Sequence, residues 1–489
     1  MQFGAIARIL GLLLALFSMT LLPPLMVAFW YGDGDTVTFA AAFLFTLFSG
    51  VFLWWPARRK RRELRVRDGF LVVVLFWTVL ALYGSLPFYW SDNLNLNFAS
   101  AAFESFSGLT TTGATVITGL DSLPHAILYY RQQLQWFGGM GIIVLAVAIM
   151  PMLGVGGMQL YKAETPGPVK DSKLTPRIAG TAKALWKIYF GLTVICALLY
   201  WAAGMSLFDA IGHAYTTIAI GGLSTHDASI GFFKSDTIEL IASVFMFLGA
   251  VNFSLHFLAV KSFGKGEFPS NIPYFKDPEF RAFAGFILVI VTLTSIVLWS
   301  NSYYGDGVEN IMQAIFHGIS IATTTGYSTE AFHVWPGMLP LLLIMSSFVG
   351  GCAGSTGGGM KVMRVLLLFK QGWREVQRLI HPNGVFLVKL GSRAVPEKVM
   401  ESVWGFFATF VALFIVMMML LLADGLDIVT AFSAVTACMN NLGPGLNKVA
   451  QNYQIISDFG KWVLSLAMLL GRLEIFTLLV LLSPEFWKK

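Results

Sequence analysis

Long apolar runs recur along this chain and predict a bundle of membrane-spanning helices. A helix needs about 20 apolar residues to cross the hydrocarbon core of a bilayer. Ten runs approach or reach that length, and the eighth is short and leads into glycines. The runs lie near residues 9–30, 38–55, 69–90, 132–153, 185–203, 237–260, 282–300, 337–350, 402–423 and 462–482.

Four apolar segments between these runs are too short to cross, and each predicts a surface helix or a re-entrant helix. They lie at 97–112, 206–221, 309–325 and 427–442, and aligning each on one glycine reveals a repeat. The four glycines are Gly113, Gly222, Gly326 and Gly443, which are 109, 104 and 117 residues apart. Twelve residues earlier stand Ala101, Ala210, Ala314 and Ala431, and six residues earlier stand the small residues Ser107, Thr216, Ser320 and Ala437. The residues just before the alanines, Ser100, Asp209, Gln313 and Thr430, are expected to cap the short helices.

The repeat predicts an all-α polytopic membrane protein. Four copies of span, short pore helix, loop and span surround one pseudo-fourfold pore, after two N-terminal transmembrane helices. The expected units are an N-terminal pair with a basic loop (1–68) and pore repeats at 69–160, 161–262, 263–378 and 379–489.

Composition supports a membrane protein. Of the 489 residues, 56% are hydrophobic and only 12% are charged, against about 25% charged in soluble domains. The mean hydropathy is +0.70. The runs are far longer than the roughly 9–11 residues of a barrel strand. Cys196, Cys352 and Cys438 are far apart and form no C-x-x-C motif, so neither a disulfide framework nor a zinc site is indicated.

The net charge is +6, and the position of the basic residues matters more than their sum. Of 33 basic residues, 28 fall at the two ends of the chain and in the loops 58–67, 161–187, 261–281 and 361–398. By the positive-inside rule, these loops and both termini are cytoplasmic. The basic residues therefore indicate topology rather than nucleic-acid binding, although 161–187 and 361–398 are also candidate docking sites for a partner.

The loops after the short helices point to cation chemistry. A helix that stops inside the membrane exposes its last carbonyls, so the following loop must line water or protein. The C-termini of four such helices carry partial negative charge and face one centre. Glycine lets backbone carbonyls turn inward, and carbonyls that replace a hydration shell are how potassium filters work. The alternative is that the glycines are helix C-caps and the threonines connect neighbouring helices.

Particular motifs resemble a known family. Thr-Thr-Gly-Tyr at 324–327 looks like the filter of potassium channels. The first loop, Leu-Thr-Thr-Thr-Gly-Ala-Thr-Val at 109–116, and the last, Asn-Asn-Leu-Gly-Pro-Gly at 440–445, resemble bacterial Trk proteins of the Trk, Ktr and HKT superfamily of potassium transporters. The resemblance covers essentially the whole chain.

The resemblance implies a homodimer in the lipid of the bacterial inner membrane, with one pore in each protomer. It also implies a cytosolic nucleotide-binding ring of the TrkA type that gates the pore, so any nucleotide would bind the partner. Potassium is the only ion expected in this chain. Carried over position by position, its ligands are Thr111, Thr112, Gly113, Ile220, Gly221, Gly222, Thr324, Thr325, Gly326, Asn441, Leu442 and Gly443. Gly113 stands where a serine accompanies sodium preference in plant relatives, so the resemblance favours potassium.

The eighth run breaks in a glycine-rich segment, residues 350–359. Six glycines in ten residues oppose a helix, because each costs about 1 kcal/mol relative to alanine. No strand precedes the segment and no Gly-Lys-Ser/Thr follows it, which argues against a phosphate-binding loop. Close helix packing through small residues is one interpretation, and a flexible gate under the filter, as the family has, is the preferred one. The gate residues would be Gly350, Gly351, Gly354, Ser355, Thr356, Gly357, Gly358 and Gly359, together with Arg472.

Arg472 is a charged residue in the middle of the last run. A mid-bilayer charge costs roughly 2.5–3.5 kcal/mol on insertion scales, so the side chain should face the pore or a partner. A pore-facing arginine would repel cations. The alternative is a buried pair with Glu474 or with backbone carbonyls.

Two other functional classes compete with a gated pore. An ion-coupled carrier with broken helices at the midplane would have inverted repeats, whereas these four all enter from one side. A membrane enzyme would need a polar cluster in the spans, and no metal or nucleophile arrangement is apparent, so no enzymatic activity is expected. His213 and His317 share a repeat position with Glu104 and Ala434, and that variation suggests helix packing rather than shared chemistry.

Overall fold

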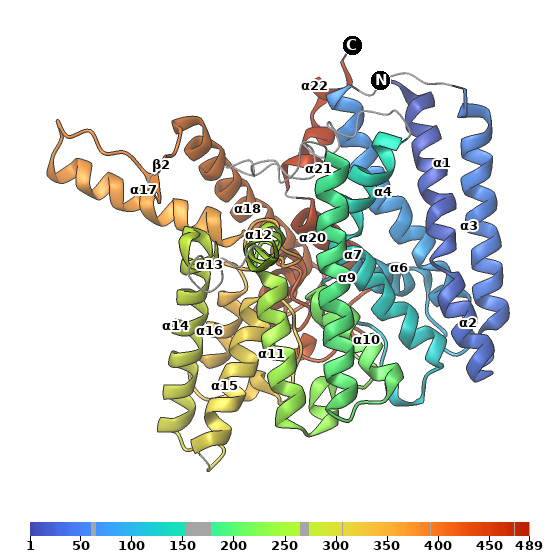
Figure 1. Ribbon diagram of the computed structural model, residues 1–489, viewed down its shortest axis with the longest axis horizontal. Coiled ribbons are helices and arrows are strands. Elements are labelled where there is room, and N and C mark those ends of the chain that lie inside the picture. The colour runs from blue at the N-terminus through green and yellow to red at the C-terminus, as the bar shows by residue number, and fades with distance from the viewer. Residues whose placement is uncertain are drawn as a thin grey trace.

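The computed structural model describes residues 1–59, 65–152, 178–264, 273–305, 307–391, 393–473 and 475–488. The fold is helical, and both termini lie at the same end of the molecule (Figure 1). Among the described residues, six helices are long and apolar enough to cross a membrane, and two bent helix pairs raise the number to eight. The predicted all-α polytopic fold is confirmed.

The N-terminal pair packs tightly through two glycines. Helices α1 (Phe3–Met19) and α2 (Leu22–Tyr31) form one span, and α3 (Thr36–Ala57) runs beside it. A Cβ atom on Gly11 would lie 2.7 Å from the carbonyl oxygen of Gly50, and one on Gly50 would lie 2.8 Å from that of Gly11. Larger residues would force the two helices apart.

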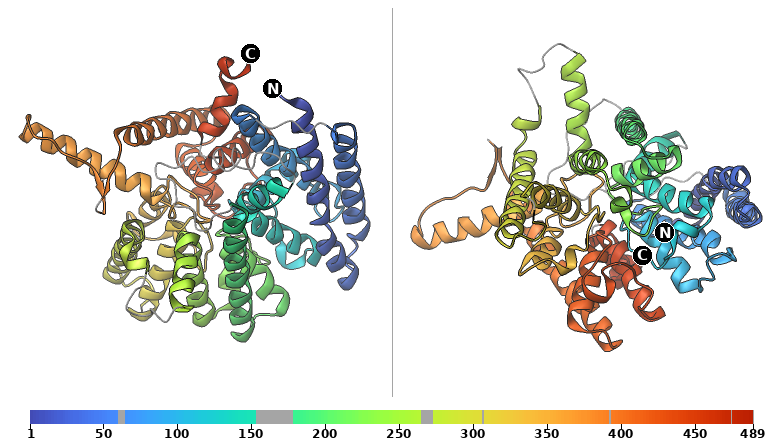
Figure 2. Two further views of the ribbon diagram at one scale, coloured as in Figure 1. Left: turned by 45° about the horizontal axis from the view of Figure 1, so that its top comes forward. Right: turned by 90° about the horizontal axis from the view of Figure 1, so that it is seen from below.

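The remaining helices follow the predicted order four times around a common centre (Figure 2). The first set is α4 (Val66–Gly84), α5 (Leu86–Trp90), α6 (Phe98–Leu109) and α7 (His125–Met152); the second is α9 (Ile178–Ala202), α10 (Leu207–Ile218), α11 (Asp236–Ala250) and α12 (Phe253–Gly264). The third is α13 (Pro273–Lys276), α14 (Pro278–Ser300), α15 (Gly307–Ala322), α16 (Leu339–Ser346) and α17 (Val362–Ile380). After the short strands β1 (Lys389–Leu390) and β2 (Arg393–Ala394), the fourth is α18 (Glu397–Ala423), α19 (Ile428–Met439), α20 (Asp458–Arg472), α21 (Phe476–Leu482) and α22 (Pro484–Trp487).

The pore helices are α6, α10, α15 and α19. Three of the four predicted capping residues are wrong by three positions, and the fourth, Gln313, lies inside α15. Asn97, Ser206 and Asp427 are the N-caps of α6, α10 and α19, and each side chain accepts a hydrogen bond from the backbone N–H three residues later. That N–H belongs to Ser100, Asp209 or Thr430, the residues expected to be caps. Helix α15 starts earlier than its counterparts, at Gly307.

Three predicted spans differ from simple helices. The run 237–260 bends by 100° between α11 and α12, and 462–482 bends by 117° between α20 and α21. The helix of the eighth run has only eight residues. Hydropathy averaged over a whole run does not detect either bend, although single polar residues stand there: Asn252 at the first bend and Arg472 at the second. At the first bend α11 ends at Ala250, and the side chain of Asn252 accepts a hydrogen bond from the N–H of Ser254 (2.8 Å) at the start of α12.

Candidate functional site

Four loops follow the pore helices and meet in a closed ring. We call them central loop 1 (residues 110–116), loop 2 (219–225), loop 3 (323–329) and loop 4 (440–446). A Cβ atom on Gly113 would collide with the carbonyl oxygen of Gly221, one on Gly222 with that of Thr325 and one on Gly326 with that of Leu442. A Cβ atom on Gly443 would lie 2.7 Å from the carbonyl oxygen of Thr112, which closes the ring. The twelve predicted ion-binding residues therefore come together in cyclic order.

The backbone of each loop has the same alternation. The repeat glycine and the residue two positions before it both have positive φ. The pairs are Thr111 (55°) and Gly113 (83°), Ile220 (53°) and Gly222 (74°), Thr324 (67°) and Gly326 (82°), and Asn441 (53°) and Gly443 (100°). Positive φ is unfavourable for residues with a Cβ, and most of all for β-branched residues. Three β-branched residues and an asparagine adopt it at equivalent places, so the surrounding structure imposes this conformation.

Each pore helix ends with the same two hydrogen bonds. The residue two before the repeat glycine donates to a carbonyl three residues back, and the next residue donates five residues back. The acceptors of the second bond are Ser107, Thr216, Ser320 and Ala437, at distances of 2.9, 2.9, 2.8 and 2.7 Å. These are the four small residues of the sequence repeat, whose backbone anchors each loop to its helix.

The inner carbonyls of the ring have almost no protein partners. Eight residues precede the glycines at the two inner positions, and all are buried: Thr111, Thr112, Ile220, Gly221, Thr324, Thr325, Asn441 and Leu442. Of their carbonyls, only that of Gly221 accepts a hydrogen bond from a described residue. Buried carbonyls are paired in more than about 90% of cases. Seven unpaired carbonyls in one ring form a strongly electronegative centre.

A cavity of about 290 Å³ opens onto this ring. All four repeat glycines line it, together with acidic residues that include Asp227 and Glu330. Partial burial would lower the pKa of His226 at the rim, but Asp209 and Asp121 outweigh burial and raise that pKa. The lining of the cavity therefore contains both acidic and basic side chains, and His226 is paired with carboxylates.

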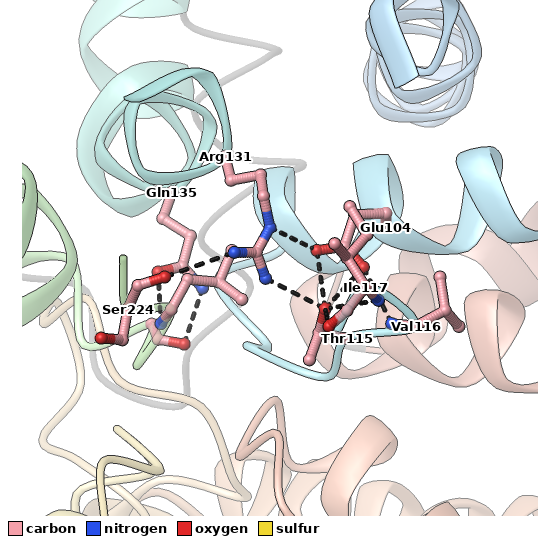
Figure 3. Close-up of polar contacts among 9 residues, drawn as sticks. Glu104, Thr115, Val116, Ile117, Arg131, Gln135 and Ser224 are labelled. Carbon is pink, nitrogen blue, oxygen red and sulfur yellow. Dashed lines mark hydrogen bonds and ion pairs between the residues drawn. The ribbon is translucent and has the colours of Figure 1, made fainter. Parts of the chain in front are cut away.

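Behind the ring, a buried ion pair fixes loop 1 (Figure 3). Nε of Arg131 lies 2.8 Å from Oε1 of Glu104, and both side chains are almost fully buried. Glu104 accepts hydrogen bonds from Oγ1 of Thr115 (3.0 Å) and from the N–H of Val116 (3.0 Å). Arg131 also donates to the carbonyl oxygen of Ser224 in loop 2 (3.3 Å), so one side chain connects two loops.

His213 and His317 are buried and pack against aromatic rings, as the sequence suggested, and each also contacts a loop through a hydrogen bond. Nε2 of His213 lies 2.9 Å from Oγ of Ser224. Ser224 stands two residues after the repeat glycine of loop 2, and Thr115 stands at the same position in loop 1. Nε2 of His317 accepts the N–H of Thr329 at 3.5 Å. In three repeats, the pore-helix position of Glu104, His213 and His317 thus bonds to the part of the loop that follows the repeat glycine, through a carboxylate or an imidazole.

The glycine-rich segment lies against the inner side of the ring. Gly358 donates its N–H to Oγ1 of Thr324 (2.7 Å), and Gly359 donates to the carbonyl of Asn440 (3.0 Å). Oγ1 of Thr356 donates to the carbonyls of Ile218 (3.0 Å) and Gly249 (3.1 Å). The segment is not helical, and it contacts central loops 3 and 4 and the end of α10.

Arg472 binds that segment instead of standing alone in a pore. Nη1 donates to the carbonyl of Thr356 (3.1 Å), and Nη2 donates to the carbonyls of Gly138 (2.5 Å) and Gly139 (3.0 Å). The arginine therefore bridges α7 and the glycine-rich segment through backbone carbonyls, as the alternative interpretation held. The other suggested partner, Glu474, lies outside the described residues, as do residues 161–177 of one candidate docking loop.

Several residues of the site have no signal in the sequence. Gln135, Arg131 and Tyr453 stand outside the aligned segments, and only the fold brings them to the loops. Tyr327 is visible in the motif of loop 3, but its hydroxyl contacts α10, at 3.3 Å from Oγ1 of Thr217 and 3.2 Å from the carbonyl of His213.

The fold is that of a polytopic membrane protein, and comparison with known proteins places it in the class of cation transport proteins. A family model described as "TrkH: Cation transport protein" matches residues 35–489. The chain is 56% identical to the Trk system potassium uptake protein TrkH of Salmonella typhimurium and 57% identical to that of Vibrio parahaemolyticus, each over 100% of both chains. It is 40% identical to TrkG of Escherichia coli over 99% of this chain and 98% of the relative.

A crystal structure of the potassium transporter TrkH from Vibrio parahaemolyticus matches with a TM-score of 0.90 at 55% identity, over 100% of both chains. The protein belongs to the TrkH family.

Proposed function

We propose that this protein takes up potassium through a pore on the axis of the four central loops. The relatives are named as potassium uptake proteins, which supports the choice of ion. The observation that carries the proposal is the ring of seven unpaired buried carbonyls. A dehydrated monovalent cation is the partner that carbonyl rings accept in membrane filters, and the pore-helix C-termini favour positive charge there.

The glycine-rich segment is the proposed gate. Its hydrogen bonds to Thr324 and Asn440 place backbone directly on the inner side of the ring. Arg472 holds it in that position through the carbonyl of Thr356. An ion that passes the ring would meet this segment next, so conduction requires it to move.

The partners and the membrane follow from the family resemblance. The protein is expected to be a homodimer in the bacterial inner membrane with cytoplasmic termini, regulated by a TrkA-type nucleotide-binding ring. Helix α17 supports an interface, because it projects from the bundle (Figure 1) and exposes large apolar side chains. Phe369 is 75% exposed, Trp373 66% and Leu379 83%, and exposed apolar patches of this kind mark interaction sites.

The decisive experiment is electrical recording from the purified protein in a planar bilayer with potassium on one side and sodium on the other. Stepwise unitary currents that reverse near the potassium equilibrium potential are expected. The bends in the second and fourth repeats also occur in carriers. Saturable counterflow without unitary currents would therefore replace the pore with an ion-coupled carrier.

A further inference from the structure

Two side chains outside the aligned motifs donate hydrogen bonds to carbonyls of the ring. Nε2 of Gln135, on α7, lies 2.6 Å from the carbonyl oxygen of Gly221 in loop 2 (Figure 3). The hydroxyl of Tyr453 lies 2.8 Å from the carbonyl oxygen of Gly443 in loop 4. Both side chains are buried, so bulk water does not compete for these bonds.

The orientation of the Gln135 amide is fixed by its second bond. The N–H of Leu223 donates to Oε1 at 3.1 Å, and only the carbonyl end of the amide can accept it. The NH₂ group must therefore face Gly221. In the tyrosine, the hydroxyl is the only group that can donate, and the acceptor is a carbonyl, so the direction of that bond is also certain.

The two donors act on opposite loops. The order of contacts around the ring is loop 1, 2, 3, 4 and back to 1, so loops 2 and 4 face each other. Loops 1 and 3 instead contain hydroxyl pairs: Oγ1 of Thr110 and Thr112 lie 2.8 Å apart, as do those of Thr323 and Thr325. None of the carbonyls of residues 111–113 in loop 1 and 324–326 in loop 3 accepts a hydrogen bond from the described part of the chain. All four loops thus share one backbone conformation, but among the described residues, side chains donate hydrogen bonds to ring carbonyls only in the opposite loops 2 and 4.

We infer that Gln135 and Tyr453 are specificity-determining residues, because each donor draws charge from one ring carbonyl and so weakens the attraction of the ring for the smaller cation. The inference rests on the proposed function. Coulomb energy varies as the inverse of distance, so a small ion such as sodium gains more than potassium from a strongly charged carbonyl. A donor that shares the carbonyl lone pairs reduces this advantage.

The cleanest test is Tyr453→Phe, which removes one hydroxyl and keeps the ring of the side chain. Its matched control is Tyr130→Phe, because the buried hydroxyl of Tyr130 donates to the carbonyl of Gly84, away from the central loops (2.9 Å). Reversal potentials in paired solutions of lithium, sodium, potassium and caesium would be measured in bilayers. We expect Tyr453→Phe to lower the potassium-to-sodium permeability ratio about 3- to 10-fold, the effect of one hydrogen bond, and to favour lithium more than sodium. The control should match the parent.

Gln135→Met gives an independent measurement with Gln133→Met as control, since Gln133 donates to the carbonyl of Thr20 in the N-terminal pair (2.9 Å). We expect the same order of permeability changes as for Tyr453→Phe, with a larger gain for lithium than for sodium. An unchanged ratio in the folded variants would overturn the inference, as would equal gains for lithium and caesium, because a merely loosened loop admits all ions. If the parent and both controls carried no potassium current, the proposed function itself would fail.

Discussion

At Gly113, the space beside one backbone atom decides which residues are tolerated. Its φ is 83°, and a Cβ atom there would meet the carbonyl of the next loop. Any side chain is therefore strained and also displaces a neighbour. The same geometry holds at Gly222 and Gly326, which explains why the sequence repeat shows these glycines most clearly.

Gly113→Ser should lower the potassium-to-sodium permeability ratio, because the displaced Gly221 carbonyl no longer has its place in the ring. Reversal potentials in mixed potassium and sodium measure the ratio. Gly285→Ser is the control, since a Cβ atom at Gly285 meets no atom within 4 Å. The ring assignment fails if Gly113→Ser and Gly326→Ser both leave the ratio unchanged.

The Glu104–Arg131 pair should matter for stability as much as for conduction. Removing one partner of a buried pair costs about 3–5 kcal/mol, because the other charge remains buried. We expect Glu104→Gln and Arg131→Met each to lower the free energy of unfolding by that amount in detergent, and the double variant to lose less than their sum. Arg378→Met, in an exposed pair with Glu375, should cost less than about 1 kcal/mol. Strict additivity of the two buried changes would contradict the pairing.

At the scale of elements, the glycine-rich segment connects parts of the chain that are distant in sequence. It is bonded to α10, α11 and the central loops 3 and 4, and Arg472 connects it to α7. A gate needs such contacts to be few and separable. Each hydrogen bond contributes only about 0.5–1.5 kcal/mol net.

Thr356→Val should raise potassium flux without changing ion selectivity, because it removes the hydroxyl that bonds the proposed gate to α10 and α11 and leaves the ring carbonyls in place. Rubidium uptake into liposomes, normalised to folded protein, measures the effect. Thr409→Val is a suitable control, since the hydroxyl of Thr409 bonds only within α18. A flux at or below that of the parent would favour a packing role for the segment.

Arg472→Ala should also raise the flux, and the structure predicts an intermediate value for Arg472→Lys. A lysine carries the charge, but it cannot span the carbonyls of Thr356, Gly138 and Gly139 as the planar guanidinium does. Flux and melting temperature would be measured for all three proteins. If Arg472→Ala melts like the parent and conducts no faster, Arg472 neither blocks the pore nor holds the gate.

The sequence predicts those elements whose cause is local. The four pore helices and their loops follow from length, apolar pattern and glycine position, and the N-caps were missed only because a polar residue also stands three positions later. The bends between α11 and α12 and between α20 and α21 could not be predicted, because Asn252 and Arg472 are single polar interruptions of long apolar runs. The partners of Glu104 and Gly221 could not be predicted either, since α7 reaches them only through the tertiary fold.

At the scale of the whole molecule, α17 stands apart from the bundle (Figure 2). It begins directly after the glycine-rich segment, and Glu279 accepts the N–H groups of Ala353 and Met363 at the two ends of this connection (2.7 and 3.1 Å). A movement of α17 would therefore be transmitted to the proposed gate through only a few residues of the chain. An interface on this helix is well placed for regulation.

Trp373→Glu should weaken the proposed homodimer, because it places a charge on the exposed apolar face of α17. Light scattering of the protein in detergent would show a shift from dimer mass toward monomer mass. Arg378→Glu also introduces a glutamate, but about 140° around the helix from Trp373, and it should leave the mass unchanged. A dimer that persists in Trp373→Glu with unchanged melting temperature would place the interface on another surface.

The closed ring of loops has a consequence for how such a pore can evolve. In a pore of four identical subunits, every substitution appears four times, and its effect on the ion is multiplied accordingly. Here the four loops are separate segments of one chain, so a substitution at Gly222 leaves Gly113, Gly326 and Gly443 unchanged. In the proposed pore, ion preference can therefore be adjusted one loop at a time, and loops 2 and 4 already differ from the Thr-Thr-Thr-Gly that loops 1 and 3 share.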